Sequence, residues 1–184
     1  TDLRKISDLS SQNMEVSAVN PKQLLEGIYT QAREEVSTND RNLQLNLPEP
    51  SQSLPDIMGD PDLLLVAIYN LLDNALKYTH AGDMVSLRAF AEGEMVVIEV
   101  RDTGIGIAAN DLPYIWDELY RSGQVRQTPG SGIGLTLVKL IVERHGGKIE
   151  VQSQIDEGTT IRVYLPAISA AVPVTGLTQP VSNL

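Results

Sequence analysis

Hydrophobic residues recur along the 184-residue chain with two periods that alternate in blocks. Spacings of three and four residues are typical of amphipathic helices, and they predict three of them. The helices are expected from Pro21 to about Thr38, from Pro61 to about Thr79 and from Gly132 to about His145. The first two begin with a capping residue followed by proline, Asn20-Pro21 and Asp60-Pro61, which is a helix start signal.

Between the helices, apolar and polar residues alternate, as is typical of β-strands. Strands are expected around Leu43–Leu47, Ile57–Met58, Val85–Ala89, Val96–Val100, Lys148–Gln154 and Thr159–Leu165. The last four are expected to form two hairpins, with turns at Glu92-Gly93 and Asp156–Gly158. This order predicts an α/β two-layer sandwich, in which the helices cover one face of a mixed, mostly antiparallel sheet.

Both ends of the chain depart from this pattern. Thr1–Val19 carries one narrow helical stripe without a partner nearby, so we interpret it as a linker or as the end of a helix from another domain. Residues from Ala167 to the end include no charged side chain, and they are expected to form a flexible tail. The globular domain is therefore expected over residues 20–166.

Composition excludes several kinds of site. Asp and Glu outnumber Lys and Arg by 24 to 14, so the net charge is −10 and the general surface is not expected to bind nucleic acid or anionic lipid. Cysteine is absent and only His80 and His145 are present, which excludes thiolate chemistry and argues against a histidine zinc site. No apolar run approaches the roughly 20 residues of a membrane span, and no signal peptide is expected. A polyanion must therefore be bound by a local group of residues, because the overall charge of the surface is unfavourable.

Three polar motifs are candidates for such a local binding site. Asn70, Asn74 and Lys77 fall on one line of a helix, where they could hold a hydrated cation and a phosphate or form an ordinary solvated face. Asp102–Ile107 follows a strand and contains glycines that let a ligand approach the backbone, although alone it could be only a tight turn. Gly130–Leu135 opens a helix, whose free N–H groups and dipole favour anions. It lacks the lysine of a P-loop and does not follow a strand, as a dinucleotide-binding turn would.

Together these motifs resemble the ATP-binding module shared by sensor histidine kinases, DNA gyrase and related ATPases, with the best match to the histidine-kinase branch. The similar segments are Asn70–Thr79 (N box), Asp102–Gly106 (G1 box), Ile115–Arg121 (F box) and Gly130–Leu135 (G2 box). Gly158–Ile161 resembles the strand that closes the nucleotide pocket, and the whole resemblance covers about Pro21–Pro166. It implies the Bergerat (GHKL) fold with an ATP lid over residues 108–129. Trp116 and Leu119 stand where the family usually has phenylalanine, but both are apolar and are expected to anchor the lid.

The resemblance also implies roles for matched positions. Asn74, with Asn70 nearby, would coordinate Mg2+, and Asp102 would accept the hydrogen bond of the adenine amine. Thr160, or Thr159, would support Asp102 through a water. The implied ATP-binding set is Asn70, Asn74, Lys77 (phosphate), Tyr78 (adenine), Asp102, Gly104, Gly106, Ile107, Tyr120, Arg121, Gly130, Gly132, Gly134, Leu135, Thr159 and Thr160.

The residues also distinguish a kinase from a hydrolase. Hydrolytic members of the wider superfamily carry a glutamate base one turn before the metal asparagine, where this chain has Asn70, so ATP is expected to be kept for transfer. The family's phosphoacceptor histidine precedes an acidic residue on a separate dimerisation domain, and neither His80 nor His145 matches it.

We therefore expect the catalytic domain of a cytoplasmic sensor histidine kinase, cut from a longer protein whose other parts could include a membrane anchor. It would bind ATP and Mg2+ and transfer the γ-phosphoryl to a histidine on the dimerisation domain of the same homodimeric kinase, for relay to a response regulator. This segment is not expected to contact nucleic acid or membrane. The alternatives are a nucleotide-sensing module that transfers nothing and a gyrase-like ATPase.

Overall fold

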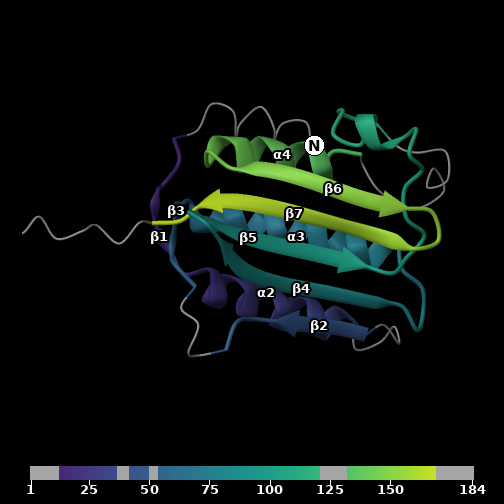
Figure 1. Cartoon of the computed structure of the whole chain (residues 1–184), viewed down its shortest axis with the longest axis horizontal. Helices are drawn as coiled ribbons and strands as arrows, with labels where there is room; N and C mark the ends of the chain where they lie inside the picture. The colour runs from purple at the N-terminus through teal and green to yellow at the C-terminus, as the bar shows by residue number, and fades with distance from the viewer. Residues whose placement is uncertain (1–12, 37–41, 50–53, 121–131, 169–184) are drawn as a thin grey trace, which may run out of the picture.

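A computed structural model describes residues 13–36, 42–49, 54–120 and 132–168 of the chain (Figure 1). The helices are α2 (Pro21–Val36), α3 (Pro61–Lys77) and α4 (Gly134–Arg144), with a short 3-10 helix η1 (Leu112–Tyr114). The strands are β1 (Ser17–Val19), β2 (Asn42–Asn46), β3 (Ile57–Gly59), β4 (Met84–Glu92), β5 (Met95–Asp102), β6 (Lys148–Gln154) and β7 (Gly158–Pro166).

Five strands form the main sheet in the order β2-β4-β5-β7-β6. Strand β2 is parallel to β4, whereas the other neighbours are antiparallel. Helices α2, α3 and α4 lie behind this sheet in the view of Figure 1. The predicted α/β two-layer sandwich, with a mixed, mostly antiparallel sheet and helices on one face, is confirmed.

The core lies between the sheet and the helices. Alternate strand residues such as Leu87 on β4 and Ile98 on β5 are fully buried there, and they belong to the same core cluster as Ile68 and Leu72 of α3. Because strand side chains alternate between faces, the residues between them point to the other face, which no helix covers in Figure 1. Burying these aliphatic side chains stabilises the fold by roughly 1.5–3 kcal/mol each.

Both predicted helix starts are present in the structure. Oδ1 of Asn20 accepts a hydrogen bond from the Gln23 N–H at 3.1 Å. Oδ1 of Asp60 accepts from the Asp62 and Leu63 N–H groups, each at 3.1 Å, ahead of Pro61. Each cap satisfies backbone donors that the helix itself leaves unpaired.

Several boundaries differ from the sequence-based expectation. Ser17–Val19 is strand β1, paired antiparallel with β3, so the helical interpretation of Thr1–Val19 is wrong over these three residues. Residues 1–12 lie outside the described part of the chain. The helices are shorter than expected, since α3 ends at Lys77 and α4 begins at Gly134. The single 3-10 turn η1 is an element that the periodicity did not predict.

The first two residues of the segment expected to be a flexible tail, Ala167 and Ile168, are held by backbone hydrogen bonds. The Ala167 N–H donates to the Glu94 carbonyl at 2.9 Å, and the Ile168 N–H donates to the Asp56 carbonyl at 2.7 Å. These bonds tie the end of β7 to the β4–β5 turn and to the residue before β3, and residues 169–184 are outside the described part. Within the described residues, no helix is both long and apolar enough to cross a membrane.

Candidate nucleotide site

The N-box asparagines and the start of α4 lie against each other. A Cβ placed on Gly134 would lie 3.2 Å from Oδ1 of Asn70 and 3.8 Å from Nδ2 of Asn74. Glycine at this position therefore allows the first turn of α4 to approach the polar line of α3. The structure brings together a pair of carboxamides and a helix N-terminus, which favours an anion beside them.

The two asparagines differ in what their side chains contact. Nδ2 of Asn70 donates to the Val66 carbonyl at 2.7 Å, which turns its Oδ1 toward the start of α4. No hydrogen bond of the Asn74 side chain with another described residue is present, so its carboxamide can rotate to present Oδ1. Amide oxygens are hard ligands of the kind Mg2+ accepts, usually together with phosphate oxygens and water. The donor set thus fits the magnesium site that the resemblance implies.

Lys77 lies one turn beyond Asn74 at the end of α3. Its Nζ forms an ion pair with Asp73 at i, i+4, and the side chains of both are partly exposed to solvent. A phosphate contact by Lys77 would therefore compete with this pair, which is weak because water screens it. Tyr78 follows as the C-cap residue of α3 and is half-buried.

Asp102 is the most constrained residue of the site. It ends β5 on the helix-covered face and is buried. Its Oδ1 accepts hydrogen bonds from the Gly104 N–H at 2.9 Å and the Thr159 N–H at 3.2 Å. Burial raises the pKa of Asp102, the two backbone donors oppose this rise, and nearby Asp83 adds to it. No described residue donates to Oδ2, so this oxygen is the one available to an external donor such as an exocyclic amine.

The loop after Asp102 is wedged between α3 and the β6–β7 turn. A Cβ on Gly104 would overlap the Tyr78 carbonyl oxygen, which instead accepts a hydrogen bond from the Ile105 N–H at 3.1 Å. A Cβ on Gly106 would overlap the Gln154 carbonyl oxygen, and Gly106 has φ +65°. These close approaches explain why the motif needs its two glycines.

Ser153 connects the loop to β7, and the sequence did not single it out. Its Oγ accepts from the Ile107 N–H at 2.8 Å, donates to the Gly158 carbonyl at 2.9 Å and lies 2.9 Å from Thr159 Oγ1. The sequence pattern does not distinguish Ser153, because it is one of several polar residues in a strand where polar and apolar residues alternate. It fixes Ile107 and Thr159 on the same side of the sheet as Asp102.

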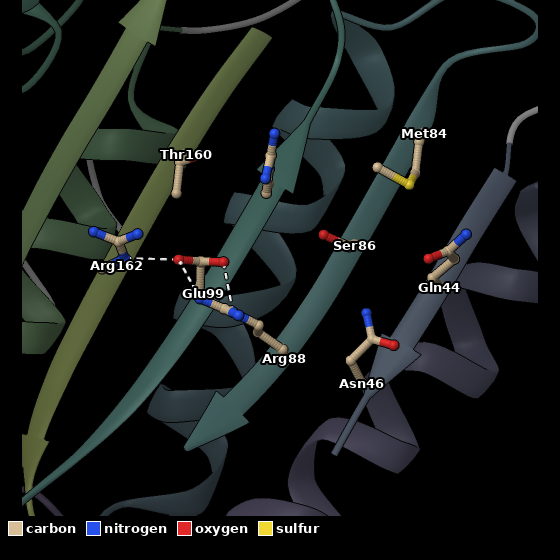
Figure 2. A pocket seen from close by; sticks show the side chains of 9 residues that line it. Gln44, Asn46, Met84, Ser86, Arg88, Glu99, Thr160 and Arg162 are labelled. Carbon is tan, nitrogen blue, oxygen red and sulfur yellow. Dashed lines mark hydrogen bonds and ion pairs between the residues drawn. The ribbon is translucent and has the colours of Figure 1, made fainter. Parts of the chain in front are cut away.

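The two threonines of the last strand point to opposite faces. Thr159 lies on the face of Asp102, and its backbone N–H contacts that carboxylate directly. Thr160 pairs with Arg101 and lies among the residues of the uncovered face (Figure 2). The structure therefore brings Thr159, and not Thr160, to the other site residues.

The F-box segment packs in part against α4. Ile115 is buried, and Trp116 packs against the core while its carbonyl accepts from Thr136 Oγ1 at 3.0 Å. Leu119, by contrast, is 58% exposed with φ +63°, so the expectation that it anchors the lid is wrong in this structure. Its N–H donates to the Gly132 carbonyl at 3.1 Å.

The structure describes only some of the remaining residues in the expected ATP-binding set. Tyr120 Oη donates to Asp111 Oδ1 at 2.8 Å, and the Tyr120 ring lies 5.6 Å from that of Tyr114. Leu135, in the first turn of α4, is half-buried against the core. Arg121 and Gly130, two members of the expected set, lie outside the described residues.

Comparison with known proteins assigns this arrangement. Residues 59–169 match the family described as histidine kinase-, DNA gyrase B-, and HSP90-like ATPase. The chain belongs to this family. The matched range includes every described residue of the site, from Asn70 on α3 to Thr160 on β7.

Relatives place the chain in the sensor histidine kinase branch of the family. It is 34% identical over 142 residues to the sensor-like histidine kinase SenX3 of Mycobacterium tuberculosis, covering 76% of this chain and 34% of that protein. It is 30% identical over 177 residues to the adaptive-response sensory kinase SasA of Synechococcus elongatus, covering 93% and 45%. The chain thus spans between a third and a half of these relatives.

A solved structure agrees with this placement. The mycobacterial sensor histidine kinase MprB superposes with a TM-score of 0.71 at 26% identity, covering 83% of this chain and 97% of that one. The sequence-based assignment to the ATP-binding catalytic domain of a sensor histidine kinase is confirmed, and the gyrase-like alternative is not favoured.

Proposed function

We propose that this domain binds Mg-ATP between α3, the Asp102 loop and the start of α4, and presents the γ-phosphoryl to a histidine on another domain. The carrying observation is the arrangement of Asp102, whose Oδ1 is occupied by two backbone N–H groups while Oδ2 is available. A carboxylate held in this way suits the exocyclic amine of adenine and would reject the carbonyl that guanine has there. The proposed nucleotide is therefore ATP rather than GTP.

The phosphates are proposed to lie at the other end of the site. Asn74 and Asn70 would supply oxygen ligands to Mg2+, and the N–H groups at Gly132, Gly134 and Leu135 would donate to phosphate oxygens. Bound magnesium would neutralise phosphate charge. This local set lets an acidic domain hold a polyanion, since it relies on amides and a helix dipole rather than on net charge.

The same residues support transfer over hydrolysis. Asn70 donates its side-chain N–H to the Val66 carbonyl and has no carboxylate to accept a proton from water. The nearby carboxylate of Asp73 is paired with Lys77. Since no carboxylate of the described part of α3 is positioned as a base for water, the domain's contribution would be to position ATP and stabilise charge, which is most of what phosphoryl transfer requires.

Partners and location complete the proposal. The acceptor would be a histidine on the dimerisation domain of the same homodimeric kinase, and the phosphoryl group would pass on to a response regulator. His145 does not serve as the acceptor, because both ring nitrogens are engaged in buried hydrogen bonds. The domain would work in the cytoplasm, where ATP is available.

Calorimetric titration tests nucleotide binding. We expect Asn74→Ala to weaken Mg-ATP binding at least about tenfold, with a smaller effect on ATP in EDTA, because the lost group is a metal ligand. Asn42→Ala, an exposed asparagine on β2, is the matched control and should bind as the wild type does. Equal affinity in both variants would show that the pocket is misassigned.

A second experiment tests transfer. The domain is mixed with the dimerisation region of its parent kinase and radiolabelled Mg-ATP, and phosphohistidine is measured alongside free phosphate. We expect acid-labile, alkali-stable label on the dimerisation region. Binding of ATP without label would favour a nucleotide sensor, and steady phosphate release that depends on Asn74 would favour a gyrase-like ATPase.

A further inference from the structure

The uncovered face of the sheet holds a polar hollow of about 250 Å3 across β2, β4, β5 and β7 (Figure 2). It lies on the opposite side of the sheet from Asp102 and α3, and it is separate from the proposed nucleotide site. Its lining residues are Gln44, Asn46, Met84, Ser86, Arg88, Glu99, Arg101, Thr160 and Arg162.

Glu99 holds two guanidinium groups in place at one end of this hollow. Its side chain is only 5% exposed, and its two oxygens accept from Arg88 Nε at 2.7 Å and from Arg162 Nε at 2.6 Å. Figure 2 shows the carboxylate on β5 lying between the two arginines of β4 and β7. Each guanidinium has five N–H donors and uses at most two of them on Glu99, so donors remain for an external acceptor.

Arg101 lies two residues beyond Glu99 on the same strand and the same face. Its side chain is exposed, and it forms no hydrogen bond or ion pair with the residues that the structure describes. The neighbouring strands provide Glu99 with its two arginine partners, but no described residue on them forms an ion pair with Arg101. Three arginines and one glutamate give the hollow a formal charge of +2, in a chain whose net charge is −10.

We propose that this hollow docks an extended acidic segment of another protein domain. One carboxylate of the segment would pair with Arg101, and a second would pair with the free N–H groups of Arg88 and Arg162. Residues two apart on a strand are separated by about 6.8 Å, so an extended peptide with carboxylates at alternate positions matches this spacing. Arginines pre-positioned on strands suit such recognition, because their planar donors bind carboxylates bidentately.

The shape of the site favours a peptide over a small metabolite. The lining side chains spread over four neighbouring strands instead of converging on a closed cavity (Figure 2). Small-molecule sites usually enclose most of their ligand, and a hollow on an open sheet face leaves a small anion largely in water. A segment lying along β5 would contact Arg101 and, on the strands to either side, Arg88 and Arg162 at once.

Nuclear magnetic resonance titration of the 15N-labelled chain tests the proposal with the peptide (Glu-Ser)4, at low salt. We expect shifts on β4, β5 and β7 around Glu99, no such shifts with (Gln-Ser)4, and weaker binding at higher salt. Arg101→Gln should weaken the affinity about threefold, the size of one exposed charge pair. Arg33→Gln on α2 makes the same substitution on the helix side and should leave it unchanged.

Two outcomes would overturn the proposal. One is (Glu-Ser)4 binding that maps away from β5 or that Arg101→Gln does not weaken. The other is citrate producing the same shifts with the same affinity, which would make the hollow a site for small anions. The spectrum of the Arg101→Gln variant also verifies folding, because an exposed arginine with no partner among the described residues is not required for the sheet.

Discussion

Nε2 of His145 accepts a hydrogen bond from the backbone N–H of Asp60 at 3.0 Å, although the two residues are 85 positions apart. Nδ1 of the same ring lies 2.7 Å from the Ile141 carbonyl, to which it donates a hydrogen bond. Both ring nitrogens are thus engaged in buried hydrogen bonds, which gives His145 a structural role. His145 thus connects the end of α4 to the start of α3.

Replacing His145 tests this connection. His145→Ala would leave the Asp60 N–H and the Ile141 carbonyl without their side-chain partner and would open a cavity. We expect the free energy of unfolding to fall by about 2–3 kcal/mol, measured by urea denaturation. Because the ring also contacts Gly59, where a Cβ would lie 2.7 Å from His145 Cδ2, Gly59→Ala should be destabilising as well.

His80 is the control for this prediction. Its side chain is 77% exposed and lies 3.8 Å from the Asp83 carboxylate. His80→Ala should change the stability by less than about 0.5 kcal/mol, as is usual for surface substitutions. A large loss from His80→Ala, or none from His145→Ala, would contradict the assigned role.

The pattern of apolar positions was sufficient for the main elements but not for short ones. Strand β1 has three residues and exists through its pairing with β3, about 40 positions away, and such a long-range contact leaves no local period. The isolated turn η1 likewise has no buried residue to mark it. Elements that bury a full stripe of apolar side chains, such as α3, were predictable because the stripe produces a periodic pattern of apolar residues in the sequence.

The site was predictable where backbone constraints select the residue type. Gly104 and Gly106 are required by close approach, and Asp102 by its place at the strand end. The choice between Thr159 and Thr160 depended on which face of β7 is covered. Ile161, Val163 and Leu165 mark the covered face, and counting back from them by two reaches Thr159. That signal was present in the sequence, whereas the three contacts of Ser153 were not visible there.

Glycine substitutions separate close packing from flexibility. Gly104→Ala would push a methyl group into the Tyr78 carbonyl and displace the loop from α3, so we expect clear destabilisation and loss of Mg-ATP binding. Gly27→Ala on α2 introduces a methyl group with no atom within 4 Å and should stabilise the fold by about 0.5–1 kcal/mol. Melting temperatures of both variants check the prediction. A stable Gly104→Ala variant that still binds ATP would contradict the close packing of this loop against the Tyr78 carbonyl.

The Glu99 carboxylate is expected to stabilise the fold by bridging two arginines. Glu99→Gln would leave the Arg88 and Arg162 guanidinium groups facing each other without the buried charge between them, at a cost of about 2 kcal/mol. Arg88→Gln leaves the Glu99–Arg162 pair intact, and since Arg88 is 45% exposed it should cost less than about 1 kcal/mol. Equal losses in urea denaturation would indicate that the carboxylate does not bridge both arginines.

The protonation of Asp102 predicts a pH dependence of stability. Burial raises the pKa of Asp102 above its ordinary value of 3.8, so the folded state binds this proton more tightly than the unfolded state does. The resulting stabilisation is fully present below the unfolded pKa and is lost as the pH rises through the folded pKa. Asp102→Asn is neutral at every pH and keeps an Oδ1 that can accept from Gly104 and Thr159. Urea denaturation of both proteins between about pH 3.5 and pH 7 should therefore show the free energy of unfolding of the variant increasing relative to that of the wild type as the pH rises. A difference that stays constant over this range would mean that the carboxyl titrates alike in the folded and unfolded chains.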